Sequence, residues 1–314
     1  MTHPFEKYLT HELKLKLNEY HRYYHNYDHV VDVYDRLYDV FPELEMEKCL
    51  FAIYHDIIYD PTRTDNEDRS IEKLLEDHPV DGEAVVELIE ATKYNWKSYT
   101  ELSNRQRYFV RADLGIFLDL RINIFETEMK IFREYQFVDW SYYRDKRIEV
   151  LESFKNRLEP LQTNIDKRIE LLKTWKPKIG LFAGSFNPFH KGHLNVLQKA
   201  SYTFDKVIVA KGRNTDKDDV KFDGNSETLK YYQTIEYSGL LTELLYSLDY
   251  DVTLVRGIRN GNDLAYESNL ANVLRDINGS PITIHYILCD NEYSHVSSSV
   301  VRQLEKFNLK NLYL

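Results

Sequence analysis

The chain has 314 residues and a formal net charge of −10 at pH 7, with 43% hydrophobic and 29% charged residues. This length exceeds the size at which a single core usually stops growing, so we expect two domains. The acidic balance, together with the lack of a long Lys/Arg block, argues against nucleic acid as a partner, and no long apolar segment indicates export or a membrane, so we expect a cytoplasmic protein.

The cysteine content is low. Only Cys49 and Cys289 occur, far apart and without a CxxC pair. This argues against a disulfide framework or a cysteine zinc site, and it fits a reducing compartment.

The spacing of apolar residues in the first half of the chain is typical of helices. From Phe5 to about Trp175, apolar residues recur at spacings of three and four, as in Val30, Val33 and Leu37. This period predicts amphipathic helices, and we find no convincing pair of strands in this half. We therefore predict an all-α domain over residues 1–175.

Histidines and aspartates stand at three places in this half: His29, the adjacent pair His55 and Asp56, and Asp113. Together they would supply two imidazoles and two carboxylates, a mixed set suited to a divalent metal. His25 would share a helix face with His29 if this segment is helical, because residues four apart are neighbours. Any one of these residues alone would be more simply explained as structural.

The order of these residues, and the contexts RYYHNxxH, HDxxYD and RLEPL, resemble the HD superfamily of metal-dependent phosphohydrolases over roughly residues 15 to 172. The resemblance implies that His29, His55, Asp56 and Asp113 bind a metal such as Mn²⁺, Fe²⁺, Zn²⁺ or Mg²⁺. A single metal ion is favoured, because two-metal members usually have extra histidines where this chain has only His78.

Hydrolysis would use the metal to lower the pKa of bound water and to polarise a phosphoryl oxygen of a nucleotide-like ester or anhydride. Glu67 or Asp60 could position that water, and Arg22 or His25 could hold the substrate phosphate. A domain that has lost catalysis and serves as a scaffold is the alternative.

The spacing of apolar residues changes after Trp175. Pro177 cannot continue a helix interior and disfavours helical geometry at Lys176, so we place the domain boundary near residue 176. Short apolar runs at 179–182, 207–210, 252–255 and 282–287 then alternate with helix-length segments. This alternation predicts an α/β domain with a parallel sheet over residues 176–314, with its ligand at the carboxyl ends of the strands.

The most informative stretch is GSFNPFHKGH, which follows the first predicted strand. Gly184 permits a tight turn, and the positive N-terminal end of the next helix would favour triphosphate oxygens. His190 and His193 could then bracket the phosphates. The alternative is an ordinary strand-to-helix turn with surface histidines.

This stretch resembles the GxFxPxHxGH signature of the nucleotidylyltransferase superfamily, which has a Rossmann-like fold. Residues 255–260 and 263–267 look like the RGLR and DFEYE motifs of phosphopantetheine adenylyltransferase, and residues 297–302 resemble the ISSS-type motif. The resemblance assigns His190 and His193 to the triphosphate, Arg256 and Arg259 to phosphates or the second substrate, Lys217 (with Lys221 as a rival) to the acceptor phosphate, and Gly184, Ser185, Phe186, Gly192, Glu267, Ser297, Ser298 and Ser299 to the nucleotide.

The resemblance implies a bifunctional enzyme whose second domain uses ATP with Mg²⁺. Adenylyl transfer to 4′-phosphopantetheine would give dephospho-coenzyme A and pyrophosphate. However, the form SFNPFHxGH is closer to nicotinamide or nicotinate mononucleotide adenylyltransferases, so NAD synthesis is an alternative. A nucleotide-binding module without turnover is a third possibility, and the sequence leaves a homo-oligomer open.

Overall fold

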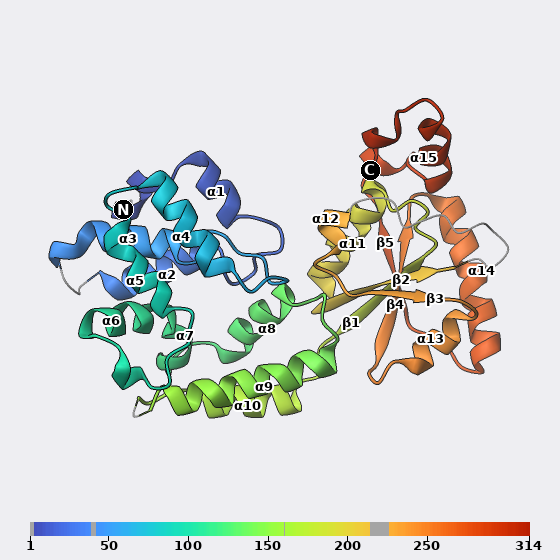
Figure 1. The fold of residues 1–314 in the computed structure, drawn as a ribbon. Helices are drawn as coiled ribbons and strands as arrows, with labels where there is room; N and C mark the ends of the chain where they lie inside the picture. Colours follow the sequence, from blue (N-terminus) through green and yellow to red (C-terminus); the bar gives the residue numbers. More distant parts are fainter. Residues whose placement is uncertain (1–2, 39–41, 160, 214–225) are drawn as a thin grey trace. The chain divides into compact units, whose positions relative to one another are not determined.

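The structure is a computed structural model that describes residues 3–38, 42–159, 161–213 and 226–314. The chain divides into two compact units (Figure 1). The first unit comprises Met1–Tyr135 and Trp140–Trp175, and the second comprises Gln136–Asp139 and Lys176–Leu314. No helix in the described part of the chain is long and apolar enough to cross a membrane.

The first unit is helical, and its described residues contain no strand. Short 3₁₀ turns occur at Pro4–Tyr8, Pro42–Leu44 and Tyr99–Glu101. The α-helices are α1 (His11–Leu17), α2 (Tyr27–Leu37), α3 (Glu45–Tyr54), α4 (Asn66–Asp77), α5 (Glu83–Ala91), α6 (Asn104–Asp113), α7 (Gly115–Leu118), α8 (Ile124–Glu134), α9 (Trp140–Arg157) and α10 (Ile165–Thr174).

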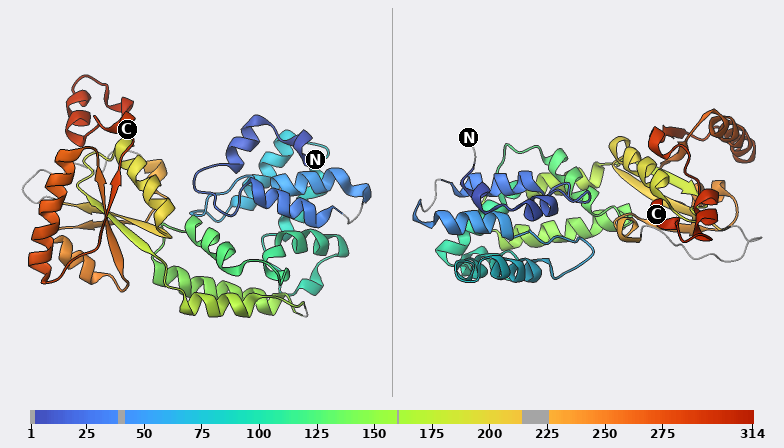
Figure 2. Two further views of the ribbon diagram at one scale, coloured as in Figure 1. Left: turned by 180° about the vertical axis from the view of Figure 1, so that it is seen from behind. Right: turned by 90° about the horizontal axis from the view of Figure 1, so that it is seen from above.

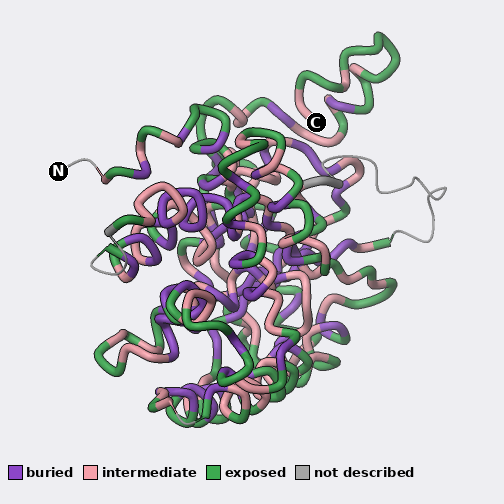
Figure 3. The backbone as a smooth tube through the Cα atoms, turned by 60° about the vertical axis from the view of Figure 1, so that its left-hand side comes forward, coloured by how far each residue is buried: buried purple, intermediate pink, exposed green. Residues whose placement is uncertain are grey.

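Helix α2 shows why the apolar spacing produces this packing. Val30, Val33 and Leu37 recur at spacings of three and four, and all three are buried in a core shared with α3 and α5. Figure 3 shows the same alternation of buried and exposed residues along other helices. The Asn26 side chain accepts the Asp28 and His29 N–H groups and so fixes where α2 begins. His25 therefore precedes the helix, so the condition under which it would share a helix face with His29 is not met.

A buried ionic group joins α8, α9 and α10. Glu128 and Arg168 are fully buried, and their side chains lie 2.5 Å apart. Arg147 forms a second ion pair with Glu128 at 3.0 Å. Arg168 also donates to the Ile116 carbonyl at 2.6 Å. Every charge in this group has a charged partner, which burial requires.

The second unit has a five-stranded parallel sheet with the strand order β3-β2-β1-β4-β5. The predicted α/β class is therefore confirmed. The strands are β1 (Ile179–Gly184), β2 (Lys206–Gly212), β3 (Thr234–Tyr237), β4 (Val252–Ile258) and β5 (Ile284–Leu288). The helices are α11 (Lys191–Thr203), α12 (Ser226–Leu229), α13 (Leu241–Ser247), α14 (Gly261–Asn278) and α15 (Ser298–Glu305), with 3₁₀ turns at Asn291–Tyr293 and Lys310–Leu312.

Helices cover both faces of this sheet. Helices α11 and α12 lie on one side, and α13 and α14 lie on the other (Figures 1 and 2). Strands β1 and β2 are buried along almost their whole length, as central strands of a parallel sheet must be. Strand β3, at one edge, has exposed and half-buried residues in alternation. This arrangement places the crevice of the sheet between the carboxyl ends of β1 and β4.

The four residues Gln136–Asp139 lie before the boundary near residue 176 but belong to the second unit. Lys206 is fully buried, and its ammonium donates to the carbonyls of Gln136 and Val138. The Gln136 side-chain oxygen accepts the Val207 N–H at 3.1 Å. The Tyr250 hydroxyl donates to Asp139 at 2.8 Å. The segment Gln136–Asp139 is thus hydrogen-bonded to β2 and to the chain just before β4.

Candidate functional site

Two imidazoles stand at the start of α11. His190 is the N-cap residue and His193 lies in the first turn. The Nδ1 atom of each accepts the backbone N–H of the other, at 3.4 and 3.3 Å. Because both Nδ1 atoms are acceptors, the neutral rings carry their protons on Nε2. Each ring therefore has one N–H that α11 does not use.

Both histidines are held neutral. Burial, assisted by the Arg259 guanidinium, lowers the pKa of His190 to about 4. Burial, His190 and Arg259 lower the pKa of His193 well below its usual value. Two uncharged N–H donors beside a cation suit the binding of phosphate oxygens.

Glycines allow the close approach of these rings. A Cβ atom on Gly192 would lie 3.2 Å from two atoms of the His190 ring. A Cβ on Gly184 would lie 2.9 Å from the Phe186 ring. Phe186 has a φ of +44°, is buried and packs edge-on against His193 at 5.0 Å. Gly184 at the end of β1 and Gly192 in the first turn of α11 therefore leave room for the Phe186 and His190 rings.

Arg256 reaches the same edge of the sheet from β4. It donates from Nη1 to the Ala183 carbonyl of β1 at 2.6 Å. It also forms a two-pronged pair with Glu267 of α14, at 2.7 and 2.6 Å. Three of its five N–H groups are used, so two remain for a ligand. Glu267 has both carboxylate oxygens on Arg256, so its place is to orient that guanidinium.

Arg259 is held in a similar way. Its Nε and Nη2 donate to Asp263 at 2.8 and 3.0 Å, and its Nη1 donates to the Val296 carbonyl at 3.1 Å. Its guanidinium lowers the pKa of both His190 and His193, so its field reaches the start of α11. This adds a second fixed cation at the carboxyl end of β4.

The serine motif lies against the loop that follows β1. Ser297 caps α15 by accepting the Val300 N–H at 3.2 Å. Ser298 donates to the Pro188 carbonyl at 3.0 Å. The Ser299 hydroxyl accepts from Arg302, which also donates to the Asn187 carbonyl. Ser298 therefore contacts the loop that carries the histidines directly, and Ser299 is linked to it through Arg302. Ser185 is exposed in that loop, and Lys217 with its rival Lys221 lies outside the described residues.

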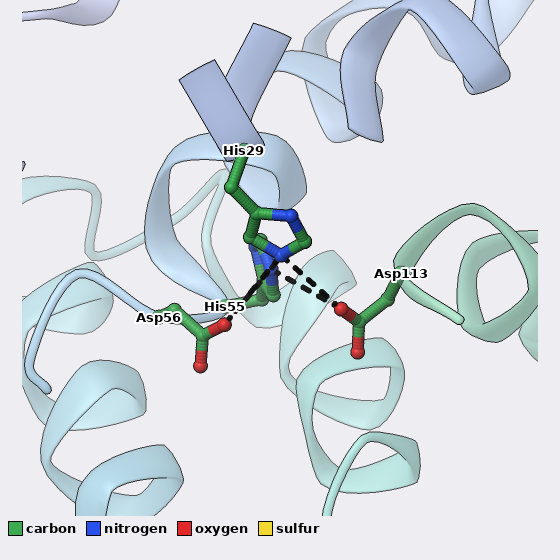
Figure 4. A group of neighbouring side chains, drawn as sticks. All are labelled: His29, His55, Asp56 and Asp113. Carbon is green, nitrogen blue, oxygen red and sulfur yellow. Dashed lines mark hydrogen bonds and ion pairs between the residues drawn. The ribbon is translucent and has the colours of Figure 1, made fainter. Parts of the chain in front are cut away.

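The first unit brings its four predicted ligand residues together. Their ligand atoms all lie within 4.8 Å of one another (Figure 4). The two Nε2 atoms of His29 and His55 are 3.1 Å apart. A carboxylate oxygen of Asp56 lies 3.2 Å from His55 Nε2, and one of Asp113 lies 3.4 Å from His29 Nε2. Residues from α2, from the end of α3 and from the end of α6 thus meet at one point.

Hydrogen bonds orient the cluster for a cation. His55 Nδ1 lies 3.0 Å from the Phe51 carbonyl and 3.2 Å from that of Ala52, so it carries the proton and leaves an Nε2 lone pair. Burial opposes a charge on His55, yet the Asp56 carboxylate raises the pKa of this ring to about 9. The two carboxylates thus attract positive charge to this point, and the donor set fits a divalent metal.

His25 is fixed beside the cluster by a buried carboxylate. Glu134 accepts His25 Nδ1–H at 2.6 Å, the backbone N–H groups of His25 and Tyr24 at 2.9 and 2.7 Å, and the Tyr59 hydroxyl at 2.8 Å. Burial opposes protonation of His25, but Glu134 raises the pKa of His25. Sequence reasoning did not find Glu134, because this residue lies 109 positions from His25 in the chain.

The other residues predicted for this site, Glu67, Asp60 and Arg22, are not among the four clustered ligand residues. Burial, with the carboxylates of Asp56 and Asp113, raises the pKa of Glu67, so the charge of the cluster acts on this carboxyl group. Asp60 instead stabilises a turn by accepting the Thr62 N–H and hydroxyl at 3.0 and 2.7 Å. Arg22 is buried and donates to the carbonyls of His25, Asp56 and Ile57. It supports the loops around the cluster from within.

Tyr94 is another residue near the cluster that the sequence did not predict. Its hydroxyl donates to Asp113, and its carbonyl accepts from Arg157. Its φ of +51° lies in the left-handed region, which is uncommon for a residue with a side chain. It therefore supports one ligand residue from outside the cluster.

Comparisons with known proteins concern the second unit. Residues 181–227 match the family model described as cytidylyltransferase-like. The phosphopantetheine adenylyltransferase of Porphyromonas gingivalis is 38% identical over 141 residues, which are 42% of this chain and 90% of that protein. That of Levilactobacillus brevis is 33% identical over 146 residues, 43% of this chain and 88% of that protein.

Among solved structures, a lipopolysaccharide core biosynthesis protein from Thermoplasma volcanium covers 37% of this chain and 99% of its own. Its TM-score is 0.28 and its identity 19%. This overlap is too weak to support a functional conclusion.

Proposed function

We propose that the second unit transfers an adenylyl group from ATP to 4′-phosphopantetheine, because through this unit the chain belongs to the phosphopantetheine adenylyltransferase family. The products would be dephospho-coenzyme A and pyrophosphate. The observation that carries this proposal is the pair of neutral imidazoles at the start of α11, whose Nε2–H groups are not used by the helix.

The proposed reaction is an in-line displacement. A phosphate oxygen of the acceptor attacks the α-phosphorus of ATP, and the bond to the bridging oxygen of the pyrophosphate breaks. Negative charge then builds on the leaving pyrophosphate. The Nε2–H groups of His190 and His193, with Arg259 nearby, supply donors and positive charge for it. No covalent link to the protein is needed, so positioning is the main requirement.

Metal ions would reach this unit with the nucleotide. In the part of the chain that the structure describes, a set of at least three clustered metal-ligating side chains occurs only in the first unit. Mg²⁺ for adenylyl transfer would therefore be held chiefly by ATP phosphates, and its chemistry would be to neutralise their charge.

The test is incubation of the full chain with ATP and one acceptor at a time: 4′-phosphopantetheine, nicotinamide mononucleotide or nicotinate mononucleotide. Mass spectrometry identifies the product. Dephospho-coenzyme A supports the proposal, whereas NAD or its nicotinate analogue would support the mononucleotide alternative. ATP binding without pyrophosphate release from any acceptor would support a non-catalytic module.

Two variants test the role of the imidazoles. His193→Gln keeps a polar group in the first turn of α11 but removes the imidazole, and it should lose most pyrophosphate release. His295→Ala is the matched control, because this exposed histidine contacts Tyr313. Far-UV circular dichroism should show both variants folded. Equal activity of the two variants would contradict the proposal.

We also propose that the first unit is a metal-dependent phosphohydrolase. The observation that carries this is the convergence of His29, His55, Asp56 and Asp113 from three separate helices or helix ends. A bound divalent metal would supply an activated water and polarise a phosphoryl oxygen.

The chain's own groups have distinct places in this proposal. Glu67, whose pKa is raised by burial and by the carboxylates of the cluster, can accept a proton from the attacking water. His25, fixed through Nδ1 by Glu134, can donate a proton from Nε2 to the leaving oxygen. Asp60 has a different place, because Oδ1 of its carboxylate accepts the Thr62 N–H and hydroxyl.

Metal analysis of the purified full chain tests this second proposal, followed by a screen of nucleotide monophosphates, triphosphates and cofactors for phosphate release. His55→Ala should lose bound metal and hydrolysis together. His11→Ala, at an exposed site at the start of α1, should retain both. Retention of metal and hydrolysis by His55→Ala would overturn the proposal.

A further inference from the structure

The two faces of the sheet in the second unit carry different charged groups. Phe182 of β1 and Val255 of β4 pack with the apolar side of α11, the helix that carries the imidazoles. Arg256 follows Val255 directly, so its side chain leaves the opposite face, where α14 supplies its partner Glu267. In an in-line displacement the attacking and leaving oxygens lie on opposite sides of the phosphorus. With the pyrophosphate at the imidazoles, the acceptor phosphate is expected on the face of Arg256.

The strand register puts Tyr237, the last residue of β3, on this same face. Tyr237 pairs with Gly212 of β2. Ala210, two residues before Gly212, pairs with Ala183 of β1. Strands β1 and β4 pair in register up to the positions just before Ala183 and Arg256. Because side chains alternate along each strand and register partners share a face, the Tyr237 and Arg256 side chains leave the sheet on the same side.

Tyr237 and Arg256 extend toward each other across the sheet. The Tyr237 ring lies over Gly212, where a Cβ atom would lie 3.1 Å from the tyrosine hydroxyl. Arg256 reaches from β4 to the Ala183 carbonyl of β1 at 2.6 Å. Strands β3 and β4 are separated by β2 and β1, so they lie about 14 Å apart, and each side chain covers about one strand spacing. The remaining gap, about 5 Å, is one that a single phosphate group can bridge.

The Tyr237 hydroxyl is available to a ligand. It makes no hydrogen bond to a described residue, yet it is not one of the fully buried polar atoms without a partner, so it keeps contact with solvent. Burial raises the pKa of Tyr237, although the Arg256 guanidinium opposes this rise. The hydroxyl therefore keeps its proton at neutral pH and can donate it. Gly212 beside it is half-buried and Ser185, directly after β1, is exposed, so these strand ends are open to solvent.

We propose that Tyr237 is a further acceptor-binding residue, whose hydroxyl donates to the phosphate of 4′-phosphopantetheine while the unused N–H groups of Arg256 bind the same phosphate. The inference rests on the proposed adenylyl transfer for the identity of the acceptor. A phosphate monoester has three terminal oxygens, so one can attack ATP while the other two accept from Tyr237 and Arg256. The hydroxyl contributes to binding rather than to the transfer, so its loss should raise the acceptor KM and leave kcat nearly unchanged.

Binding without turnover gives the first test. The full chain is titrated by calorimetry with 4′-phosphopantetheine and with pantetheine, which lacks the phosphate, in the absence of ATP. We expect Tyr237→Phe to weaken binding of 4′-phosphopantetheine roughly tenfold and to leave binding of pantetheine unchanged, because the lost hydrogen bond reaches only the phosphate. An equal effect on both ligands, or no effect on either, would overturn the inference.

Tyr202→Phe is the matched control. This tyrosine lies near the end of α11, at the opposite end of the helix from the imidazoles, and it is 87% exposed. Removal of its hydroxyl should leave both affinities unchanged, and far-UV circular dichroism should show both variants folded. The Tyr237 ring stays in Tyr237→Phe, and its hydroxyl has no partner among the described residues, so the fold should be kept. Equal weakening of 4′-phosphopantetheine binding in the two variants would contradict the role of Tyr237.

Steady-state kinetics separate this inference from the proposed adenylyl transfer. We expect Tyr237→Phe to have a roughly tenfold higher KM for 4′-phosphopantetheine and an unchanged KM for ATP. If wild type and variant form dephospho-coenzyme A with the same acceptor KM, the transferase stands and the inference is overturned. If the wild type forms no dephospho-coenzyme A, yet Tyr237→Phe selectively loses 4′-phosphopantetheine binding, the transfer proposal is overturned and the role of Tyr237 is supported.

Discussion

The imidazoles of His190 and His193 are stacked, with ring centroids 3.6 Å apart and 19° between their planes. Each ring accepts the other residue's backbone N–H, so the stack is also the cap of α11. Any change that separates the rings therefore alters both the helix start and the direction of the two free N–H groups.

Gly192→Ala should disturb this stack. The new methyl group would lie 3.2 Å from the His190 ring, which must then move by a few tenths of an ångström. We expect kcat/KM for adenylyl transfer to fall about tenfold or more, because positioning dominates this reaction. Gly261→Ala is the control, since this glycine starts α14 and its Cβ would meet nothing within 4 Å. Similar kinetics for both variants would show that the stack is unimportant.

His190 should make the second unit less stable in acid. The pKa of His190 is about 4 in the folded chain and about 6.5 when unfolded, mainly because of burial. Between these values the unfolded state binds more protons, so stability is complete above pH 6.5 and is lost as pH falls toward 4. For this one group the loss from pH 7 to pH 5 is about 2 kcal/mol.

The measurement is urea unfolding of the wild type and His190→Gln at both pH values, followed by far-UV circular dichroism. Tryptophan fluorescence would not report this unit, because the three tryptophans, at 96, 140 and 175, lie in the other one. The variant should lose less stability on acidification than the wild type. An identical loss in both proteins would contradict the assignment.

Tyr94→Phe should weaken metal binding by the first unit. The Tyr94 hydroxyl donates to Asp113 and so orients one ligand. Loss of such an outer partner typically lowers metal affinity by about 10- to 100-fold. Competition with a chromophoric chelator gives the affinity, and Tyr108→Phe, on the exposed side of α6, is the control. Unchanged affinity in Tyr94→Phe would rule out this supporting role.

Lys206→Met should loosen the segment Gln136–Asp139. The ammonium donates to the carbonyls of Gln136 and Val138, and the change leaves the Val138 carbonyl without that donor. We expect a loss of about 1–3 kcal/mol and faster amide hydrogen exchange in this segment. Lys199→Met, which removes a partly exposed pair with Asp290, should leave exchange there unchanged. Unaltered exchange in Lys206→Met would show that other contacts hold the segment.

The sequence predicted elements better than it predicted contacts. The parallel sheet followed from short apolar runs such as 207–210, because a central strand must be apolar on both faces. The stretch with His190 and His193 was also placed between the first strand and the next helix, and the structure has it there. By contrast, the His25–Glu134 and Tyr94–Asp113 contacts join positions far apart in the chain, and no local period encodes them.

Residue type also did not specify the direction of each side chain. Arg22 and Asp60 have the chemistry for phosphate or water, yet their hydrogen bonds are made to nearby backbone and to Thr62. Glu267 likewise faces Arg256, which a list of motif residues could not show. These outcomes depend on which partner the folded chain brings within reach.

The course of the backbone around Gln136–Asp139 matters for separating the two proposed activities. A fragment that starts at Lys176 would lack the carbonyls that Lys206 contacts, and burial already lowers the pKa of Lys206 to about 7. Such a fragment would expose a patch that the intact protein covers, and poor solubility could be mistaken for lack of catalysis. Single substitutions in the intact polypeptide are therefore the sounder way to assign each activity to its half.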